Sequence, residues 1–376
     1  MTEPNQTKDT AILIPSYKPD GKLAPYVAAL KAAGFAKIVV VDDGSGEEFA
    51  PVFATIAQDE VVHIIRYAVN GGKGVALKRG MQYLWEECPG CRFVITADSD
   101  GQHTVSDTLR MCEALHKNGN GMLLGSRNFS QENVPTRSML GNRITSVVFY
   151  LLYGNWVSDT QTGLRGFGRD LLPKMMAVRG ARYEYEMNML IDCAIAKIPI
   201  HKLEIETVYE NNNEGSHFRT LQDSARIYGT IFAGFFRFIS SSAISFGLDY
   251  GLFVLFNFLF KTYVPSLEHQ FRFAFIAMMG NILVATVAAR LISGVFNFYV
   301  NKNLVFHDHG DTKRAIFRYM CVFLLNMLLS AGLTSSVHLW LGMSDNIAKI
   351  PVDILLFLLS YQLQQKWVFV TGDTGK

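Results

Sequence analysis

The spacing of apolar residues divides the chain into two unlike parts. Up to about residue 220, short apolar runs alternate with longer segments that carry charges, whereas apolar residues dominate from about residue 235 onward. Because strand patterns alternate with helix patterns, we expect an α/β domain with a mostly parallel sheet and helices on both faces. The predicted strands cover residues 11–15, 37–41, 61–67, 93–96 and 122–125, and the predicted helices cover residues 23–33, 75–87 and 105–117.

Four apolar stretches in the second part are long enough to cross a bilayer. The connection between the second and third stretches carries Lys302, Lys313 and Arg314, and basic loops tend to face the cytoplasm. We therefore expect an all-α four-helix transmembrane domain over residues 237–376 in the inner (plasma) membrane, with both termini and the polar domain in the cytoplasm. The four expected spans are residues 238–260, 273–298, 316–341 and 348–369.

Two further segments are expected to lie on the membrane without crossing it. Residues 138–153, inside the polar domain of residues 1–220, are apolar but short and interrupted, which indicates an interfacial helix. Residues 221–236 predict an amphipathic helix that joins the two domains. An ordinary core helix is the alternative for both segments.

Composition narrows the class of function. A formal net charge of +2 argues against nucleic-acid binding as the main role. Cys88 and Cys91 have C-x-x-C spacing, but no second pair follows, and the Pro-Gly between them is typical of a loop. Reduced thiols are consistent with a cytoplasmic domain.

Polar clusters follow several of the predicted strands, at the edge where open α/β sheets bind ligands. Asp98 and Asp100 stand two residues apart after the strand at 93–96, and such a pair can hold a hard divalent cation and, through it, a diphosphate. A solvated turn is the alternative. Lys73, in a glycine-flanked run, resembles part of a phosphate cradle, although the sequence has neither a Walker A motif nor G-x-G-x-x-G after the first strand.

The motifs IPSYKP, VVVDDGSG, NGGKGVALKRG, DSDGQH and GSR resemble, in order and spacing, those of family 2 glycosyltransferases of GT-A fold, which is Rossmann-like. Together with DTQTGLRGF, YEYEM and EGSHFRT, they resemble in particular the polyprenyl-phosphate hexose transferases of the dolichol-phosphate mannose synthase branch. This resemblance covers about the first 220 residues. Residues 288–306 resemble the GtrA-like four-span membrane family, which is linked to the movement of lipid-linked sugars.

The resemblance implies a role for individual residues. Asp98 would lie beside the ribose and diphosphate, and Arg127 would face the acceptor phosphate. The middle residue of D-S-D is commonly alanine in the family, and serine is close to it in size. The nucleotide would be held by Pro15, Tyr17, Asp43 and Lys73. The ligands of Mg²⁺ or Mn²⁺ would be Asp98, Asp100 and Gln102.

The implied reaction is inverting transfer of a hexose from a nucleotide sugar, for which we expect a UDP-sugar, to polyprenyl (undecaprenyl) phosphate. A phosphate monoester is already anionic near neutral pH, with a second pKa of about 6, so no strong general base is needed. Cations that hold two phosphate groups together are needed instead, and arginine suits this task. Asp159 is expected to orient an arginine or the sugar hydroxyls, or to act as a base. The candidate phosphate ligands are Arg127, Arg137, Arg165 and Arg219, with an exposed surface position as the alternative for Arg137 and Arg165.

Other polar residues lie within or beside these motifs. Glu184 and Glu186 would face one side of a strand but diverge on a helix, and they are candidates for contact with the sugar or an arginine. His103 and His217 are expected to be neighbours of the site and not catalytic groups.

Two features of the apolar part suggest internal organisation. Segments 297–306 (NFYVNKNLVF) and 360–369 (SYQLQQKWVF) share an aromatic second residue and a Val-Phe ending, which predicts two tandem helical hairpins. Asp249 and Arg290 lie at comparable depths in the first and second stretches. Charges inside a membrane usually pair, so we expect an ion pair between them.

Two alternatives remain open. A glycosyltransferase that uses a hydroxyl acceptor, making a glycolipid or polysaccharide, needs much of the same donor machinery. The GtrA-like part is either a flippase for the lipid-linked sugar or an anchor and oligomerisation module, and the family resemblance suggests a homotetramer.

Overall fold

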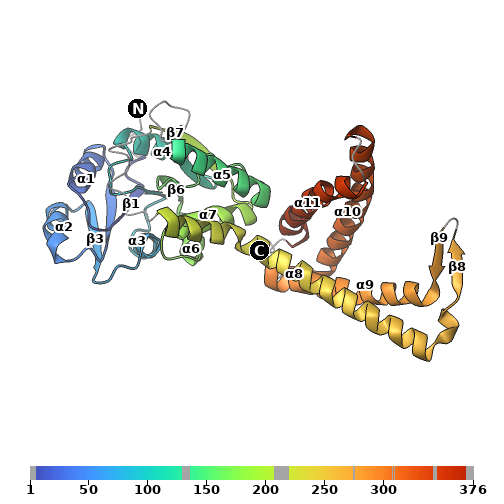
Figure 1. Ribbon diagram of the computed structural model, residues 1–376. Coiled ribbons are helices and arrows are strands. Elements are labelled where there is room, and N and C mark those ends of the chain that lie inside the picture. Colours follow the sequence, from blue (N-terminus) through green and yellow to red (C-terminus); the bar gives the residue numbers. More distant parts are fainter. Residues whose placement is uncertain are drawn as a thin grey trace. The chain divides into compact units, whose positions relative to one another are not determined.

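The structure, a computed structural model, describes residues 6–128, 136–206, 220–273, 276–306, 308, 310–341 and 345–369. The chain forms two compact units, Met1–Ile231 and Phe232–Lys376 (Figure 1).

The first unit is built on a seven-stranded sheet with the strand order β3-β2-β1-β4-β6-β5-β7. Its strands are β1 (Thr10–Ser16), β2 (Lys37–Asp43), β3 (Val62–Tyr67), β4 (Phe93–Thr96), β5 (Met122–Arg127), β6 (Arg165–Gly168) and β7 (Ile200–Ile205). The β6 strand is antiparallel to β4 and β5, while the β1–β2, β1–β4, β2–β3 and β5–β7 pairs are parallel. The mostly parallel sheet is therefore confirmed.

Helices cover both faces of this sheet. On one face Ile12 and Ile14 belong to a buried cluster with residues of α1, α2 and α4, and on the other face Leu13 packs against Gly80 of α3. Coverage on both sides explains why β1 is apolar without alternation. The helices are α1 (Leu23–Ala32), α2 (Ala50–Ile56), α3 (Lys73–Glu87), α4 (Val105–Asn118), α5 (Thr136–Tyr153), α6 (Leu172–Ala177) and α7 (Glu184–Ile195).

Helix α3 begins two residues before its predicted start. Gly72 precedes it with a φ of 95°, a conformation that glycine adopts readily. Lys73 is consequently the first residue of a helix, next to the carboxyl ends of β1 and β4.

In its described residues, the second unit is helical apart from one short hairpin. Its elements are the later part of α8 (Thr220–Tyr263), β8 (Gln270–Phe273), β9 (Ile276–Met279), α9 (Gly280–Val300), a π-helix at Asn301–Val305, α10 (Thr312–Leu341), α11 (Asp345–Leu363) and a second π-helix at Gln364–Val368. In the described residues, two helical stretches are long and apolar enough to cross a membrane, Ala225–Tyr263 and Gly280–Val305.

The expected joining helix at 221–236 and the first span form one continuous helix, α8, which contains no proline and runs through Gly229 and Gly234. One predicted boundary in this region was wrong. The second span begins at Gly280 and not at residue 273, because residues 270–273 and 276–279 pair as antiparallel strands. Apolar content alone does not distinguish a hairpin strand from the first turns of a helix.

Side-chain hydrogen bonds join α8 to α9 and to the π-helix that continues α9, and four of them lie among the described residues. Polar groups at membrane depth need such partners because lipid supplies none. Asp249, predicted to pair with Arg290, accepts a hydrogen bond from the Ser293 hydroxyl at 2.8 Å, and the side chain of Arg290 lies outside the described residues. The other three bonds join Ser241 to Asn301, Asn297 to Ser245, and Asn281 to Asn257.

The two similar segments of the second unit occupy corresponding positions. Each segment ends its helix in a π-helix. Asn301 and Gln364 are matching residues of the two segments, and the Asn301 amide donates to the Gln364 side-chain carbonyl at 3.1 Å. The matching pair Phe306 and Phe369 stack with ring centroids 5.2 Å apart. The contact of Phe298 with Phe369 at 5.5 Å has its counterpart in Tyr361 with Phe306 at 5.8 Å. The two segments thus pack on each other about an approximate two-fold relation.

Loss of the bond between Asn301 and Gln364 should destabilise the second unit. We expect Gln364→Leu to lower the melting temperature of the full chain in detergent by about 2–6 °C. The exchange Asn301→Gln with Gln364→Asn keeps an amide on each side and should lose less. Leu304→Ala, at a residue that is 62% exposed on the same π-helix, is the matched control. An exchange variant as unstable as Gln364→Leu would contradict the pairing.

Candidate active site

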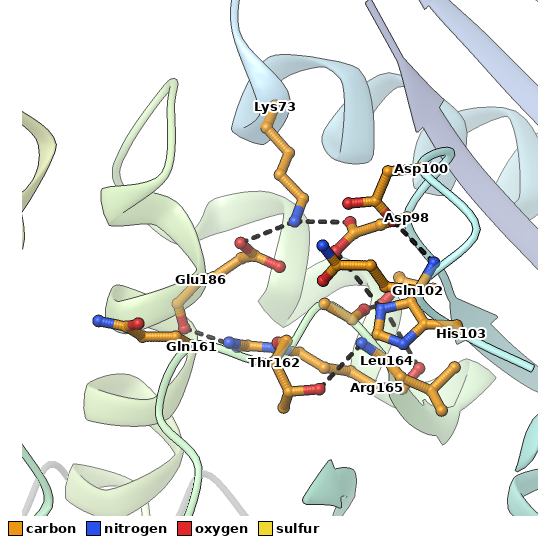
Figure 2. A network of polar contacts seen from close by, with 12 residues as sticks. Lys73, Asp98, Asp100, Gln102, His103, Gln161, Thr162, Leu164, Arg165 and Glu186 are labelled. Carbon is orange, nitrogen blue, oxygen red and sulfur yellow. Dashed lines mark hydrogen bonds and ion pairs between the residues drawn. The ribbon is translucent and has the colours of Figure 1, made fainter. Parts of the chain in front are cut away.

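The acidic motif DSDGQH leaves the sheet directly after β4, in the first unit. Asp98, Asp100, Gln102 and His103 follow this strand within one short loop (Figure 2). Asp100 accepts a hydrogen bond at 3.0 Å from the backbone N–H of Gln102, and Gly101 turns the loop with a φ of 74°. The loop places two carboxylates at the sheet edge that the sequence indicates.

Lys73 links this loop to helix α7. Its ammonium Nζ lies 2.7 Å from Asp98 Oδ1 and 3.0 Å from Glu186 Oε2 (Figure 2). Burial alone would lower the pKa of Lys73, but the carboxylates of Asp98 and Glu186 outweigh it and raise the pKa above its ordinary value. Lys73 is therefore a permanent cation between two acids.

The two aspartates of the motif have opposite electrostatic environments. Burial would raise the pKa of Asp98, but the charge of Lys73 and the nearby His103 lower it well below its usual range. The pKa of Asp100 is raised, first by burial and then by the negative charge of Asp98. A charged Asp100 is thus unfavourable in the protein alone, and a bound cation would remove that cost.

This donor set fits a hard divalent cation. The described residues contain no preformed cluster of three or more His, Cys, Asp or Glu side chains around one point. Two carboxylates with an adjacent amide, Gln102, suit Mg²⁺, which keeps several waters or phosphate oxygens among its ligands.

His103 belongs to the same cluster. Its side chain is buried, its Nε2 lies 3.4 Å from Asp98 Oδ2, and in the described residues neither ring nitrogen has a hydrogen-bond partner. The sequence places this histidine beside the site, and its direct approach to Asp98 could not be read from the motif.

The DTQTGLRGF segment packs against the side chain of Asp98 through Gly163. A Cβ atom at Gly163 would overlap Asp98 Oδ2 and lie 2.6 Å from its Cγ, so the carboxylate rests directly on a glycine backbone. The Thr96 hydroxyl donates to the Gly163 carbonyl at 2.8 Å and fixes this approach. Only glycine fits here without displacing Asp98.

A second charged group stands at the carboxyl end of β5. Arg127 donates through Nε to Asp159 Oδ2 at 2.7 Å and through Nη2 to Asp159 Oδ1 at 3.1 Å. The Asp159 side chain is fully buried, and it also accepts from the backbone N–H of Gln161. With both oxygens engaged, Asp159 is placed to orient Arg127, which favours that role over base catalysis.

Arg127→Met should destabilise the protein by about 3–5 kcal/mol, because it leaves the buried carboxylate of Asp159 without its counter-charge. Adding Asp159→Asn should restore most of the loss. Equilibrium unfolding of the full chain in detergent measures both variants, and a double variant no more stable than Arg127→Met would contradict this account of the pair.

Asp43 contacts the loop that precedes Lys73. Its carboxylate accepts from the backbone N–H groups of Gly71 at 2.7 Å and Gly72 at 2.8 Å, and from the Asn70 side chain at 3.0 Å. Burial raises the pKa of Asp43, and these backbone N–H groups partly offset the rise. The residue holds the loop before Lys73, and its contact with the nucleotide stays a prediction.

Arg165 is buried, which rules out the exposed surface position. It donates to the backbone carbonyls of Thr162 at 2.9 Å and Glu186 at 2.6 Å, and these contacts join β6 to α7. Its contact with an acceptor phosphate stays a prediction. Glu184 and Glu186 lie on helix α7 and therefore diverge, with Glu184 capping the N–H groups of Ala181 and Arg182.

The structure describes the side chains of only some of the remaining predicted residues. Pro15 lies in β1 and Tyr17 directly after it, at the same sheet edge as Asp98. The side chain of Arg137, and all of Arg219 and His217, lie outside the described residues.

Two family models match the chain, one over each part. Residues 11–175 match "Glycosyl transferase family 2", and residues 237–369 match "GtrA/DPMS, transmembrane domain". The chain is a family 2 glycosyltransferase joined to a GtrA/DPMS transmembrane domain. This confirms the resemblance drawn from the motifs, and it makes the glycosyltransferase a membrane protein.

Two archaeal relatives have similar sequences. A UDP-N-acetylglucosamine–dolichyl-phosphate N-acetylglucosaminyltransferase of Methanococcus voltae is 26% identical over 215 residues, which are 53% of this chain and 85% of the relative. Glycosyltransferase AglJ of Haloferax volcanii is 27% identical over 228 residues, which are 60% of this chain and 70% of the relative.

A solved structure of glucosyl-3-phosphoglycerate synthase from Mycobacterium tuberculosis, with Mn²⁺, UDP and glucosyl-3-phosphoglycerate, is a more distant neighbour. It is 14% identical with a TM-score of 0.47, over 61% of this chain and 81% of that one. At this distance it says nothing about what the glycosyltransferase described here binds.

Proposed function

We propose that the glycosyltransferase moves a hexose from a nucleotide sugar, a UDP-sugar, to the phosphate of a polyprenyl lipid such as undecaprenyl phosphate, with inversion at the anomeric carbon. The observation that carries this is the pairing of two charged groups: the acidic loop with Asp98 and Asp100 suits a metal-bound diphosphate, and Arg127 suits a second phosphate. The name of the Methanococcus voltae relative, which includes UDP and a dolichyl phosphate, agrees with both halves.

A divalent cation held by Asp98, Asp100 and Gln102 would offset the negative charge that develops on the departing diphosphate. Lys73, held by Asp98 and Glu186, adds a fixed positive charge beside that position. Arg127, aligned by Asp159, would orient the acceptor phosphate with its guanidinium fork.

The reaction forms one bond and breaks one bond, and it needs no proton transfer. A phosphate oxygen of the lipid forms the new bond to the anomeric carbon, and the bond from that carbon to the diphosphate breaks. The acceptor is already an anion near neutral pH, so no base is required. A single attack of this kind inverts the anomeric centre.

Helix α5 supports delivery of the acceptor from a membrane. Its exposed side chains are apolar at Leu140, Ile144, Val147 and Leu151, a spacing that follows one face of the helix. Its buried side chains are polar in the first half of the helix, at Asn142, Thr145 and Ser146, and apolar in the second half, at Phe149, Leu152 and Tyr153. We propose that this face lies in the membrane interface, with the catalytic domain and both termini on the cytoplasmic side and four helices crossing the inner membrane.

The proposal is tested by incubating the purified full chain with Mn²⁺, undecaprenyl phosphate and a panel of nucleotide sugars, followed by mass spectrometry. One sugar should be added to the lipid phosphate, and EDTA should abolish the product. Undecaprenol, which lacks the phosphate, is the matched acceptor and should remain unmodified. Glycosylation of undecaprenol in place of the phosphate would support the hydroxyl-directed alternative and overturn the proposal.

A further inference from the structure

Helix α5 buries polar side chains against the catalytic domain. Asn142 is 5% exposed, and Thr145 and Ser146 are 1% exposed each. Thr145 and Ser146 donate to carbonyls of their own helix, those of Gly141 and Asn142, and the Thr145 hydroxyl also lies 3.1 Å from the Tyr228 hydroxyl of α8. The side chain of Asn142 bonds to a different segment outside the helix.

Asn142 binds both ends of a three-residue segment, Ser158 to Thr160. Its Nδ2 donates to the Ser158 carbonyl at 2.6 Å. Its Oδ1 accepts from the Thr160 backbone N–H at 3.1 Å and from the Thr160 hydroxyl at 3.2 Å. An asparagine that both donates and accepts in this way fixes the position and the orientation of the segment.

The middle residue of that segment is Asp159, which aligns Arg127. Ser158 is also held from the β5 side, since its hydroxyl lies 2.8 Å from the Ser126 hydroxyl. A shift of α5 would therefore move the segment, and with it the carboxylate that sets the Arg127 guanidinium. The buried side chain of Asn142 therefore links helix α5 to the segment that aligns Arg127.

We propose that Asn142 is a positioning residue for acceptor binding, which fastens the membrane-facing helix α5 to the Asp159–Arg127 pair. The position of α5 at the bilayer surface then determines where Arg127 contacts the lipid phosphate. This inference rests on the proposed function, because it takes Arg127 as the acceptor ligand.

The test is a kinetic comparison of full-length variants with undecaprenyl phosphate and the nucleotide sugar identified for the wild type. Asn142→Leu removes the three hydrogen bonds at similar size, and it should raise the KM for undecaprenyl phosphate by roughly 10- to 100-fold. The KM for the nucleotide sugar should stay within about twofold, since the side chain of Asn142 bonds to Ser158 and Thr160 and, in the described residues, to none of the residues predicted to hold the donor. Thr160→Val removes only the hydroxyl contact and should shift the acceptor KM in the same direction by less.

Ser146→Ala is the matched control, because it removes a buried hydroxyl that bonds within α5 and does not touch the 158–160 segment. It should leave the acceptor KM unchanged. Equal rises in the donor and acceptor KM, or an unchanged acceptor KM in Asn142→Leu, would overturn the inference. A wild-type chain that never glycosylates undecaprenyl phosphate would instead overturn the proposed function.

Discussion

Asp100→Asn is expected to reduce turnover by roughly 100- to 1,000-fold while the protein stays folded. The asparagine Oδ1 can still accept from the Gln102 N–H, so the loop keeps its internal hydrogen bond. What is lost is the negative charge that would hold a divalent cation beside the donor diphosphate. Turnover of the nucleotide sugar and melting temperature, measured on the same preparation, separate these effects.

The stability of this variant has a predicted sign. The pKa of Asp100 is raised in the folded protein, so its ionised form is disfavoured by folding. This loss of stability begins as the pH rises through the unfolded pKa and is complete above the folded pKa. At pH 7 without metal, Asp100→Asn should be as stable as the wild type or more stable. The difference should disappear below about pH 4, where the carboxyl is protonated in both states. A less stable variant at pH 7 would contradict this electrostatic picture.

Gly163→Ala should lower turnover by roughly 100-fold, although the added group is one methyl. The new Cβ would occupy the place of the Asp98 carboxylate, so Asp98 would have to leave its contacts with Lys73 and His103. Crowding of this kind also destabilises a protein by about 1–3 kcal/mol. The measurement is kcat with saturating donor and Mn²⁺.

Gly90→Ala is the matched control for this change, because a Cβ atom at Gly90 would have nothing within 4 Å. It should leave turnover unchanged. A Gly163→Ala protein with wild-type kcat would show that the position of Asp98 is not needed for transfer.

Much of the first unit could be predicted from apolar runs. The β4 strand was predicted at its observed bounds, 93–96, because buried parallel strands are short, apolar and bounded by turn residues. β6 and β7 were missed for opposite reasons. β6 contains Arg165 and two glycines, and in β7 the polar residues His201, Lys202 and Glu204 interrupt the apolar ones without a regular alternation. Their pairing partners are distant in sequence, so no local pattern predicts them.

The sequence predicted which residues lie at the site but not which groups they contact. The strand-end rule brings Lys73, Asp98 and Asp100 together because parallel strands share one edge. The hydrogen bonds of Asp43 with residues 70–72 and the burial of Arg165 against α7 join segments that are separated in the sequence, so no local pattern predicts them. Asn142 was missed because a single polar residue in an apolar helix has no signal of its own in the sequence.

The account depends most directly on a cation held by the acidic loop. Titration of Mn²⁺ into the full-length glycosyltransferase, with UDP and in parallel GDP present, can be followed by the electron paramagnetic resonance of the free ion. The wild type should bind one Mn²⁺, and Asp100→Asn should bind it more than about tenfold more weakly. Equal affinity of the two proteins for Mn²⁺ would contradict the account.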